Sequence, residues 1–421
     1  MSNRVSSVVV GLLLLATVVV PPAVYMAMGA SSMAAGVLLI SGLYVFMFMA
    51  YASLCPSQYL GTGIFFIAAV MGVVFTQGAL SLSLNKEFDF GRFWQSNVFL
   101  TIFLLGAISM ALLAQRLTRF QADFAVKLVF YVLVLCGLAG ILSYSPFSGE
   151  DSWRPVLFFA EPSHFALSLL PFLLYVVVFS SSWMKWCLIS AGFLMALLLE
   201  SLTLLVGIAL VVCLVVPLRR LVFLALFAAL FLVTVDLDLF STVVDLDYYA
   251  ARTDLSRENQ NLSALAFMQG WERAYLNLED SNGLGVGFQQ FGIVGRRGEI
   301  FEDLARLSGE ELNLLDGGSV GPKLIGEFGV FGLVTLLVYL AYFAKRARWL
   351  RKVSLSSTIP CDRKEVFFIA CFVMYCIDIF VRGTGYFSAT GFLFIVSVLW
   401  LAFREHRGLS PKMSKMLGPV H

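Results

Sequence analysis

The stretch VVVGLLLLATVVVPPAVYMAM, from Val8 to Met28, contains no charged side chain. A helix of about 20 apolar residues is long enough to cross roughly 30 Å of hydrocarbon. Comparable stretches recur along the whole chain of 421 residues, which is 59% hydrophobic and only 13% charged. The first stretch is too long for a signal peptide and lacks a convincing small-residue cleavage site, so we expect it to be retained as a span. The sequence therefore predicts an all-α integral membrane protein.

Twelve apolar stretches qualify as candidate spans. They lie near residues 6–28, 33–54, 60–84, 96–114, 126–145, 158–180, 184–199, 202–217, 220–236, 321–343, 365–381 and 386–403. The seventh and eighth belong to one apolar run, which only Glu200-Ser201 and Thr203 interrupt. Counting this run as two spans places 18 of the 29 lysines and arginines on one side of the membrane, as the positive-inside rule requires of the cytoplasmic side. We therefore expect twelve spans with both termini cytoplasmic.

One polar segment divides the chain into three parts. Residues 237–320 form a large external loop, preceded by nine spans in residues 1–236 and followed by three spans and a cytoplasmic tail in residues 321–421. The loop holds 14 acidic residues and no lysine, and its bases are Arg252, Arg257, Arg273, Arg296, Arg297 and Arg306. These arginines either pair with the carboxylates and fold the loop, or use their planar forks to bind phosphate or carboxylate groups of a ligand.

Part of this loop has helical periodicity. The apolar side chains that recur with this spacing are Leu262, Leu265, Met268, Trp271, Tyr275 and Leu278. This pattern predicts an amphipathic helix whose apolar face lies on the membrane domain or in the membrane interface. The loop closes with Asp316-Gly317-Gly318-Ser319, just before the tenth span.

The tetrapeptide Glu161-Pro162-Ser163-His164 stands at the start of the sixth apolar stretch. A carboxylate or an imidazole left in hydrocarbon costs several kcal/mol, so these two side chains need a partner or a function. His164 is also the only histidine before residue 406. One alternative is that His164 caps the helix or is a buried side chain whose polar atoms have partners. The other is that it is a functional group together with Glu161. We take Glu161 and His164 as the candidate catalytic residues.

A second polar group lies at the end of the eleventh stretch. Asp378 and Arg382 are four residues apart, which predicts an ion pair along one helix face. The turn Gly383-Thr384-Gly385-Tyr386 then leads into the last span. The predicted topology places this turn on the same side as Glu161, His164 and the arginine-containing loop. The alternative is an ion pair that only ends a helix.

These external groups suit a substrate that carries its own leaving group. The sequence has no nucleotide-binding loop and no Cys/His cluster with metal-ligand spacing, so we expect neither a cofactor nor a metal ion. A lipid-linked diphosphate would supply the driving force itself. Arginines would stabilise the departing diphosphate, and a carboxylate or a neutral imidazole would remove the proton of an attacking hydroxyl.

The segment Phe159-Ala160-Glu161-Pro162-Ser163-His164-Phe165-Ala166 resembles the EPSxFA signature of Wzy-type O-antigen polymerases. The pieces that follow come in a similar order: Arg252, then Gln269-Gly270-Trp271, the turn from Gly283 to Gly292, Gly326-Glu327-Phe328-Gly329, and Arg382-Gly383-Thr384-Gly385-Tyr386. The resemblance implies a GT-C-like glycosyltransferase of the bacterial inner membrane. Such an enzyme joins oligosaccharide repeats linked to undecaprenyl diphosphate at the periplasmic face.

The resemblance also implies roles and partners. Arg252 and Arg273 would bind the donor diphosphate with support from Arg382, and either Glu161 or His164 would act on the acceptor hydroxyl. Asp378, Asp316 and Tyr386 would support this site. Its partners would be lipid, a Wzz-type chain-length regulator and a flippase of the same pathway, with no nucleic acid.

Two other functions remain open at this point. O-antigen ligases of the same superfamily tend to carry a histidine at the end of the large loop, where this chain has Asp316 and Ser319. A polysaccharide flippase or another secondary transporter would place charges near the bilayer midplane within internal repeats, and the two halves of this chain show no such repeat. A scaffolding role would leave the Glu161–His164 motif unexplained. The sequence therefore favours the polymerase.

Overall fold

The computed structural model describes residues 3–30, 32–51, 57–84, 87–146, 154–223, 226, 246–256, 258–309, 311–356 and 361–416. Within these ranges the chain is helical and forms isolated β-bridges but no strand. The helices are α1 (Asn3–Met28), α2 (Ala34–Tyr51), α3 (Ser57–Leu84), α4 (Phe90–Arg116), α5 (Arg119–Ile141), α6 (Pro162–Phe179), α7 (Ser182–Leu198), α8 (Leu202–Val215), α10 (Leu246–Thr253), α11 (Leu262–Asp280), α12 (Glu299–Ser308), α13 (Val320–Phe328), α14 (Val330–Leu355), α15 (Arg363–Phe380) and α16 (Ala389–Met416).

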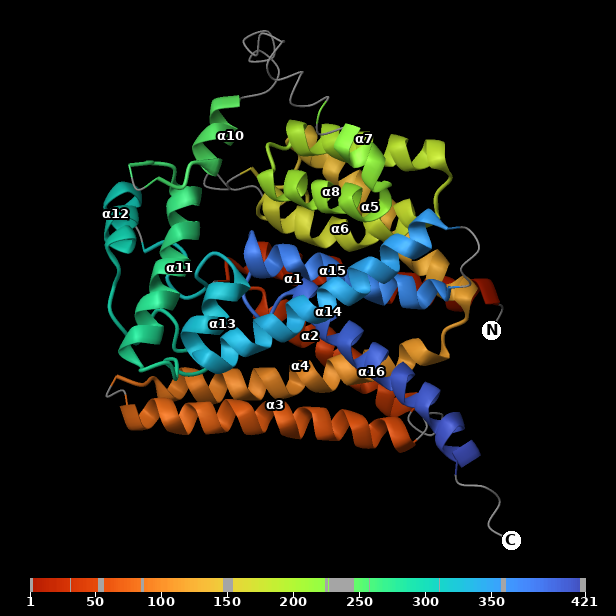
Figure 1. Cartoon of the computed structure of the whole chain (residues 1–421), viewed down its shortest axis with the longest axis horizontal. Helices are drawn as coiled ribbons and strands as arrows, with labels where there is room; N and C mark the ends of the chain where they lie inside the picture. The colour runs from red at the N-terminus through yellow and green to blue at the C-terminus, as the bar shows by residue number, and fades with distance from the viewer. Residues whose placement is uncertain are drawn as a thin grey trace.

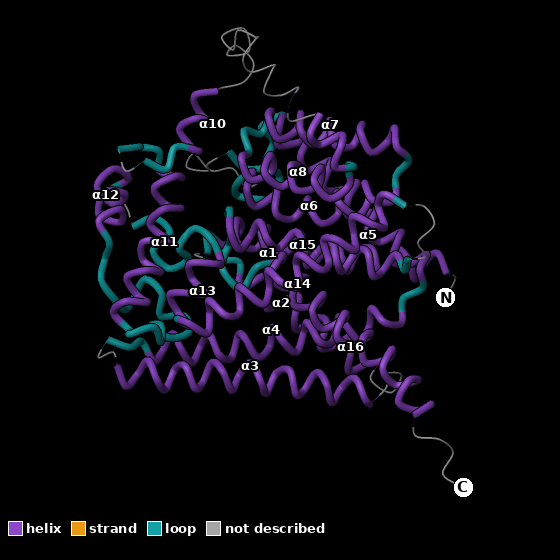
Figure 2. The backbone as a smooth tube through the Cα atoms, viewed as in Figure 1, coloured by secondary structure: helices purple, strands orange, loops and turns teal. Residues whose placement is uncertain are grey.

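The apolar helices form one bundle with a smaller lobe at one end. In Figure 1 the bundle helices lie across the view, and α10, α11 and α12 gather at the left, above the left-hand ends of α3 and α4. We call residues 246–328, from α10 to α13, the lobe. Its long connecting loops surround α11, α12 and α13 in Figure 2. The last turns of α16 lie at the opposite end of the bundle, so the lobe and the C-terminal helix end mark two different faces (Figure 1).

Two helices form the centre of the bundle. Every side chain of α6 from Phe165 to Val178 is buried, and α15 is buried in the same way from Val366 to Tyr375. These two helices pack against each other, and α6 also packs against α5 and α8. A helix that is apolar on all sides is stable only where other helices or lipid surround it. The central position of α6 fixes the place of the Glu161–His164 motif at its first turn.

The long helices are those of a membrane protein. Among the described residues, six helices are long and apolar enough to cross a membrane: Val5–Met28, Tyr59–Ser83, Phe90–Arg116, Arg119–Ile141, Pro162–Phe179 and Val330–Leu355. Three shorter apolar helices, Ala34–Ala50, Ser182–Leu198 and Leu202–Val215, accompany them. Large outward-facing side chains such as Phe46 and Phe65 are more than 70% exposed, which suits contact with lipid rather than water. The predicted ninth span, 220–236, lies mostly outside the described residues.

The predicted tenth span, 321–343, is not one helix. It divides at Gly329 into α13, which packs against α11 in the lobe, and α14, which extends along the bundle. Gly329 has φ 58° and ψ −133°, and a Cβ atom there would lie 2.1 Å from the Gly283 carbonyl oxygen. Only glycine tolerates this combination. The bond from Val330 N to Gly283 O (2.8 Å) ties the break to the lobe.

The apolar run from 184 to 217 forms two helices, as predicted. A turn at Glu200, where φ is 48°, separates α7 from α8. Several basic residues that the predicted topology places on one side of the membrane form contacts with acidic or polar residues. Arg363 pairs with Asp123, Arg404 pairs with Glu365, and Lys185 donates to Ser354. These contacts lie at the bundle end away from the lobe, in agreement with the predicted grouping of basic residues.

The amphipathic helix expected in the loop is present as α11, but its buried face differs from the predicted one. The fully buried positions include Gln269, Arg273 and Asn277, whereas Tyr275 is 64% exposed. Gly270 explains this orientation, because its Cα faces the Gly317 carbonyl so closely that a Cβ atom would lie 1.9 Å from the oxygen. The helix therefore turns its small and polar face inward.

Candidate functional site

Glu161 caps the N-terminus of α6 and forms the centre of the site. Its extended backbone (φ −140°, ψ 152°) is the conformation favoured before a proline, and Pro162 begins the helix. Glu161 Oε2 accepts hydrogen bonds from Arg382 Nη2 at 3.1 Å and from Ser163 Oγ at 2.7 Å. The Arg382 guanidinium lowers the pKa of Glu161 to about 2, although burial acts in the opposite direction. Glu161 is therefore an anion at neutral pH.

The expected pair between Asp378 and Arg382 is wrong. α15 ends at Phe380, so Arg382 leaves the helix face that Asp378 occupies. The bond from Gly383 N to Gly318 O (3.0 Å) ties this turn to the end of the lobe, and Arg382 pairs with Glu161 instead. Asp378 is 2% exposed and accepts a hydrogen bond from Thr390 Oγ1 at 2.6 Å. The i,i+4 rule failed here because it assumes that the helix continues.

His164 lies less than one turn after Glu161, on the first turn of α6. The ring of Tyr25 contacts it edge-on, with ring centroids 6.4 Å apart. Its Nδ1 atom is buried and has no hydrogen-bond partner in the structure. The imidazole lines a cavity of about 10 Å³ together with Thr384, Ser388 and Thr390. His164 is therefore a base with an unused nitrogen, beside a carboxylate that is already paired.

Arg252 reaches this site from α10. Its guanidinium lies over the ring of Tyr248, 4.2 Å from the centroid, and its Nε atom is buried without a partner. Burial lowers the pKa of Arg252, and the nearby charges of Arg382 and Arg154 act in the same direction. Arg252 forms no ion pair with the residues that the structure describes. It therefore remains a cation available to an anionic ligand.

Tyr248 holds α10 against the bundle. Its hydroxyl donates to the Glu200 carbonyl at 2.8 Å, and Arg154 lies over its ring at 5.7 Å. Arg154 also pairs with the Glu200 carboxylate. Tyr249 donates to the Ala196 carbonyl at 3.3 Å, which adds a second link between α10 and the α7–α8 turn.

Arg273 is not part of this group. It is 2% exposed on α11, where its guanidinium lies 5.8 Å from the ring centroids of both Phe291 and Phe301. Burial lowers its pKa to about 10, and its Nε and Nη1 atoms have no partner. The charges that influence it are Arg297 and Glu311, not the residues around Glu161. The structure thus places Arg273 in the interior of the lobe.

Asp316 and Tyr386 meet around Lys323. Lys323 is 2% exposed and donates to Asp316 Oδ1 at 2.9 Å and to the Leu315 carbonyl at 2.8 Å. Its Nζ also lies over the ring of Tyr386, at 5.2 Å from the centroid. Burial opposes ionisation of Asp316, but the Lys323 charge outweighs it with help from Arg92 and Arg382, so the pKa of Asp316 is lowered. Asp316 therefore lies close enough to the Glu161–Arg382 pair to affect its electrostatics.

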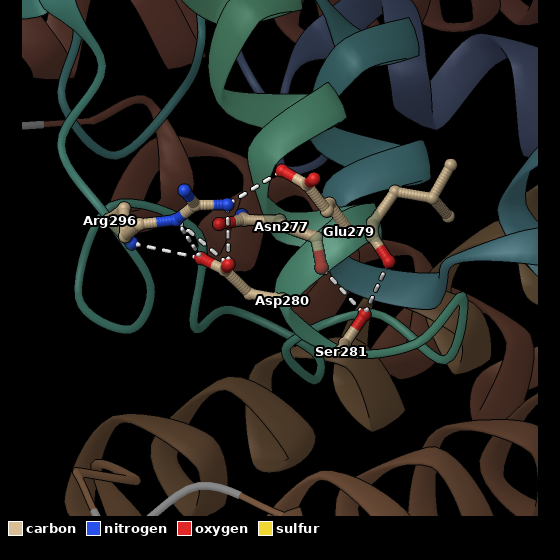
Figure 3. Close-up of polar contacts among 6 residues, drawn as sticks. Asn277, Glu279, Asp280, Ser281 and Arg296 are labelled. Atoms are coloured by element: carbon tan, nitrogen blue, oxygen red, sulfur yellow. Dashed lines mark hydrogen bonds and ion pairs between the residues drawn. The ribbon is translucent and has the colours of Figure 1, made fainter.

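Three of the loop arginines only fold the lobe. Arg296 Nε donates to Asp280 at 2.8 Å and its Nη2 donates to Glu279 at 2.6 Å, which fastens the end of α11 beside the cap formed by Ser281 (Figure 3). Arg297 pairs with Glu311, and Arg306 pairs with Asp303. Arg257 lies outside the described residues. Of the described loop arginines, Arg252 and Arg273 alone lack a carboxylate partner.

The sequence interpretation missed several groups near the site. Neither Arg154 nor Arg92 was a predicted member of the site. Arg154 joins Glu200 and Tyr248, and Arg92 Nε donates to the Gln289 carbonyl at 2.9 Å. Lys323 and Glu327 fell inside a predicted span. A charged side chain in an apparent span was the signal that could have identified them, because such residues are rarely exposed to lipid.

The described residues contain no cluster of three His, Cys, Asp or Glu side chains that could hold a metal ion. Comparison of the chain with models of protein families, with curated proteins and with solved structures gave no match. The chemistry must therefore be argued from the site itself. It contains a base with a free nitrogen, a buried carboxylate–guanidinium pair and a second guanidinium, all at the lobe end of an apolar bundle.

Proposed function

We propose that the protein is an O-antigen polymerase of the bacterial inner membrane. It joins oligosaccharide repeats linked to undecaprenyl diphosphate at the periplasmic face, with twelve spans in a GT-C-like arrangement and cytoplasmic termini. The observation that carries this proposal is the unpartnered His164 nitrogen beside the Glu161–Arg382 pair and Arg252. A lipid-linked substrate can reach this group from the apolar bundle while its sugars lie beneath the lobe.

The charge balance supports an anionic substrate. Three guanidinium groups, Arg154, Arg252 and Arg382, surround two carboxylates, Glu161 and Glu200, and Asp316 is paired with Lys323. One positive charge is left without a partner. A diphosphate accepts bidentate hydrogen bonds from guanidinium groups, and its negative charge grows as it leaves.

Each of these residues then has a separate role in the glycosyl transfer. The acceptor hydroxyl oxygen forms a bond to C1 of the donor sugar while the bond from C1 to the diphosphate oxygen breaks. Arg252 and Arg382 stabilise the departing diphosphate. The proton of the acceptor hydroxyl passes to His164, because Glu161, with a pKa of about 2, is a weak base at neutral pH. Glu161 orients Arg382. Arg273, which is buried in the interior of the lobe, does not bind the diphosphate.

Complementation of a strain that lacks this gene tests the proposal. With the wild-type chain, lipopolysaccharide should run on a gel as a ladder of repeats, and with Glu161→Ala or Arg252→Ala it should run as core with one repeat. Expression of each variant must match the wild type, and Arg306→Ala, which removes an exposed pair with Asp303, is the matched control. Full ladders from both site variants would refute the assignment.

The same gel, together with the location of the lipid-linked repeats, separates the alternatives. Bare core in the strain without the gene, with repeats on the periplasmic side, would indicate a ligase, because a ligase attaches even a single repeat. Repeats retained on the cytoplasmic side would indicate a flippase. Either result would overturn the polymerase proposal.

A further inference from the structure

A row of hydroxyl groups leads from the His164 cavity into the interior of the bundle. Ser388 and Thr390 line the cavity beside His164, and their oxygen atoms lie 3.2 Å apart. Thr390 Oγ1 donates to Asp378 Oδ1 at 2.6 Å. A hydroxyl has a single proton to donate, so Thr390 must accept from Ser388. The hydrogen bonds therefore point in one direction, from the cavity to Asp378.

A second cavity continues this row. It also measures about 10 Å³, and Leu167, Pro171, Asp378 and Thr390 are among its lining residues. Leu167 and Thr390 line both cavities. A volume of about 10–15 Å³ holds one water molecule if polar partners are present. Each cavity therefore has room for about one water molecule.

Pro171 supplies a further polar partner for such a water molecule. Proline has no N–H, so the carbonyl of Leu167, four residues earlier in α6, loses its helical hydrogen bond. Inside a membrane protein, a carbonyl freed in this way is satisfied by a side chain or an ordered water molecule. Leu167 itself lines the second cavity, together with Asp378 and Thr390, which carry a carboxyl and a hydroxyl group.

Asp378 has no basic partner in the part of the chain that the structure describes. The titratable side chains near Asp378 are those of Tyr339, Tyr375 and Cys376, which are uncharged at neutral pH. Arg382, the cation that the sequence assigned to it, pairs with Glu161. A buried carboxyl group in an apolar bundle is costly unless it is used. Among the described residues, Asp378 is the acceptor at which the hydroxyl row ends.

We propose that Ser388, Thr390 and Asp378 form a proton relay that serves His164. Its source of protons rests on the proposed function, in which His164 takes the proton of the acceptor hydroxyl. That proton moves from His164 through the cavity water to Ser388 Oγ. The Ser388 proton then moves to Thr390, and the Thr390 proton moves to Asp378, which becomes a neutral carboxylic acid. After the product leaves, Asp378 returns the proton along the same row to His164, and His164 releases it to water.

Proton exchange at Asp378 tests the relay without reference to the reaction. The full chain is placed in lipid vesicles, and infrared spectra are recorded as H₂O is replaced by D₂O. Because the relay leaves resting Asp378 ionised, the spectra are recorded at a pH low enough to protonate it, and the carbonyl band of the acid is assigned by its loss in Asp378→Asn. We measure the rate at which this band shifts after the change to D₂O. We expect this rate to be at least about tenfold lower in Thr390→Val and Ser388→Ala than in the wild type, because the new side chains cannot carry a proton.

Two further variants control for structure. Thr390→Ser keeps the hydroxyl and should exchange at the wild-type rate. Ser397→Ala removes another buried hydroxyl of α16, which donates to the Leu393 carbonyl and lies outside the row of Ser388, Thr390 and Asp378, and should also leave the rate unchanged. Equal exchange rates in all variants, or the absence of a band lost in Asp378→Asn, would overturn the relay.

Turnover measurements separate the relay from the proposed function. With a synthetic undecaprenyl-diphosphate repeat, Asp378→Asn and Thr390→Val should lower kcat about tenfold at unchanged KM, a part of the 10²- to 10⁴-fold typical of general base catalysis. If the wild type forms no polymer, the proposed function fails while the exchange experiment still decides on the relay. If His164→Ala is inactive but both relay variants keep the full kcat, the relay has no role in the reaction.

Discussion

The Glu161–Arg382 pair should couple the N-terminus of α6 to the turn after α15, and a double-mutant cycle measures this coupling. The pKa of Glu161 falls from 4.5 to about 2. The charge of Arg382 lowers this pKa most, His164 and Ser163 also lower it, and burial raises it. Such a shift corresponds to about 3.4 kcal/mol. Because the Glu161 side chain remains 35% exposed, solvent screening reduces the expected coupling by about half, to roughly 1.7 kcal/mol.

The assay is reversible unfolding in mixed detergent micelles of the wild type, Glu161→Gln, Arg382→Gln and the double variant. The pKa of Glu161 is lower in the folded state, so its contribution is present above pH 4.5 and is lost as the pH falls toward about 2. The coupling should therefore be constant from pH 6 to 8 and begin to decrease below pH 4.5. Arg346 and Glu405, a pair at the other end of the bundle with Glu405 57% exposed, serve as the control and should couple by less than about 1 kcal/mol. A Glu161–Arg382 coupling no larger than that of the control would refute the reasoning.

Two further predictions concern the lobe. Arg252→Ala should raise KM for the lipid-linked donor by about 10- to 100-fold, since a charged hydrogen bond contributes about 1.5–3 kcal/mol. Arg273→Met should keep its activity and its stability, because it replaces an unpaired buried cation by an apolar side chain. Equal losses of activity of the two variants in steady-state kinetics would contradict these different roles. Gly270→Ala should lower the free energy of unfolding by about 2 kcal/mol or more, because the new methyl group would meet the Gly317 carbonyl. Gly72→Ala should not lower it, because the space around Gly72 is open. Matching unfolding curves for the two variants would contradict the close approach of Gly270 and Gly317.

Hydropathy was sufficient to predict the helices that form the bundle. The energy of placing apolar side chains and satisfied backbone groups in lipid depends on local sequence. The division of residues 184–217 into two helices could be predicted only with the positive-inside rule, because the run is apolar almost throughout. The break at Gly329 could not. It depends on the bond from Val330 to Gly283, which is 47 residues earlier, and on a φ that only glycine adopts without strain.

Some members of the candidate site were predictable, but their pairings were not. Glu161 and His164 were identified because a titratable side chain next to an apolar helix is costly without a role. Arg252 and Arg382 were identified from the order of motifs that resembles the O-antigen polymerases. The partner of Arg382 depends on where α15 ends, and the bond from Gly383 to Gly318 of the lobe holds that end. Such long-range contacts have no local sequence pattern.

Arg273 shows the same limit on α11. Apolar spacing predicts which face of a helix is hydrophobic, but here the close approach of Gly270 and Gly317 turns the opposite face inward and buries Arg273. The sequence gives no sign of this contact.

Polymerisation by the purified chain in lipid vesicles tests the central claim most directly. The substrate is a synthetic oligosaccharide repeat on undecaprenyl diphosphate, and the products are resolved by length. We expect the wild type to extend the repeat and to release undecaprenyl diphosphate in equal amount, and His164→Ala to be slower by about 100-fold or more, the contribution of a general base. Absence of extension by the wild type, or extension by His164→Ala at the wild-type rate, would contradict the account.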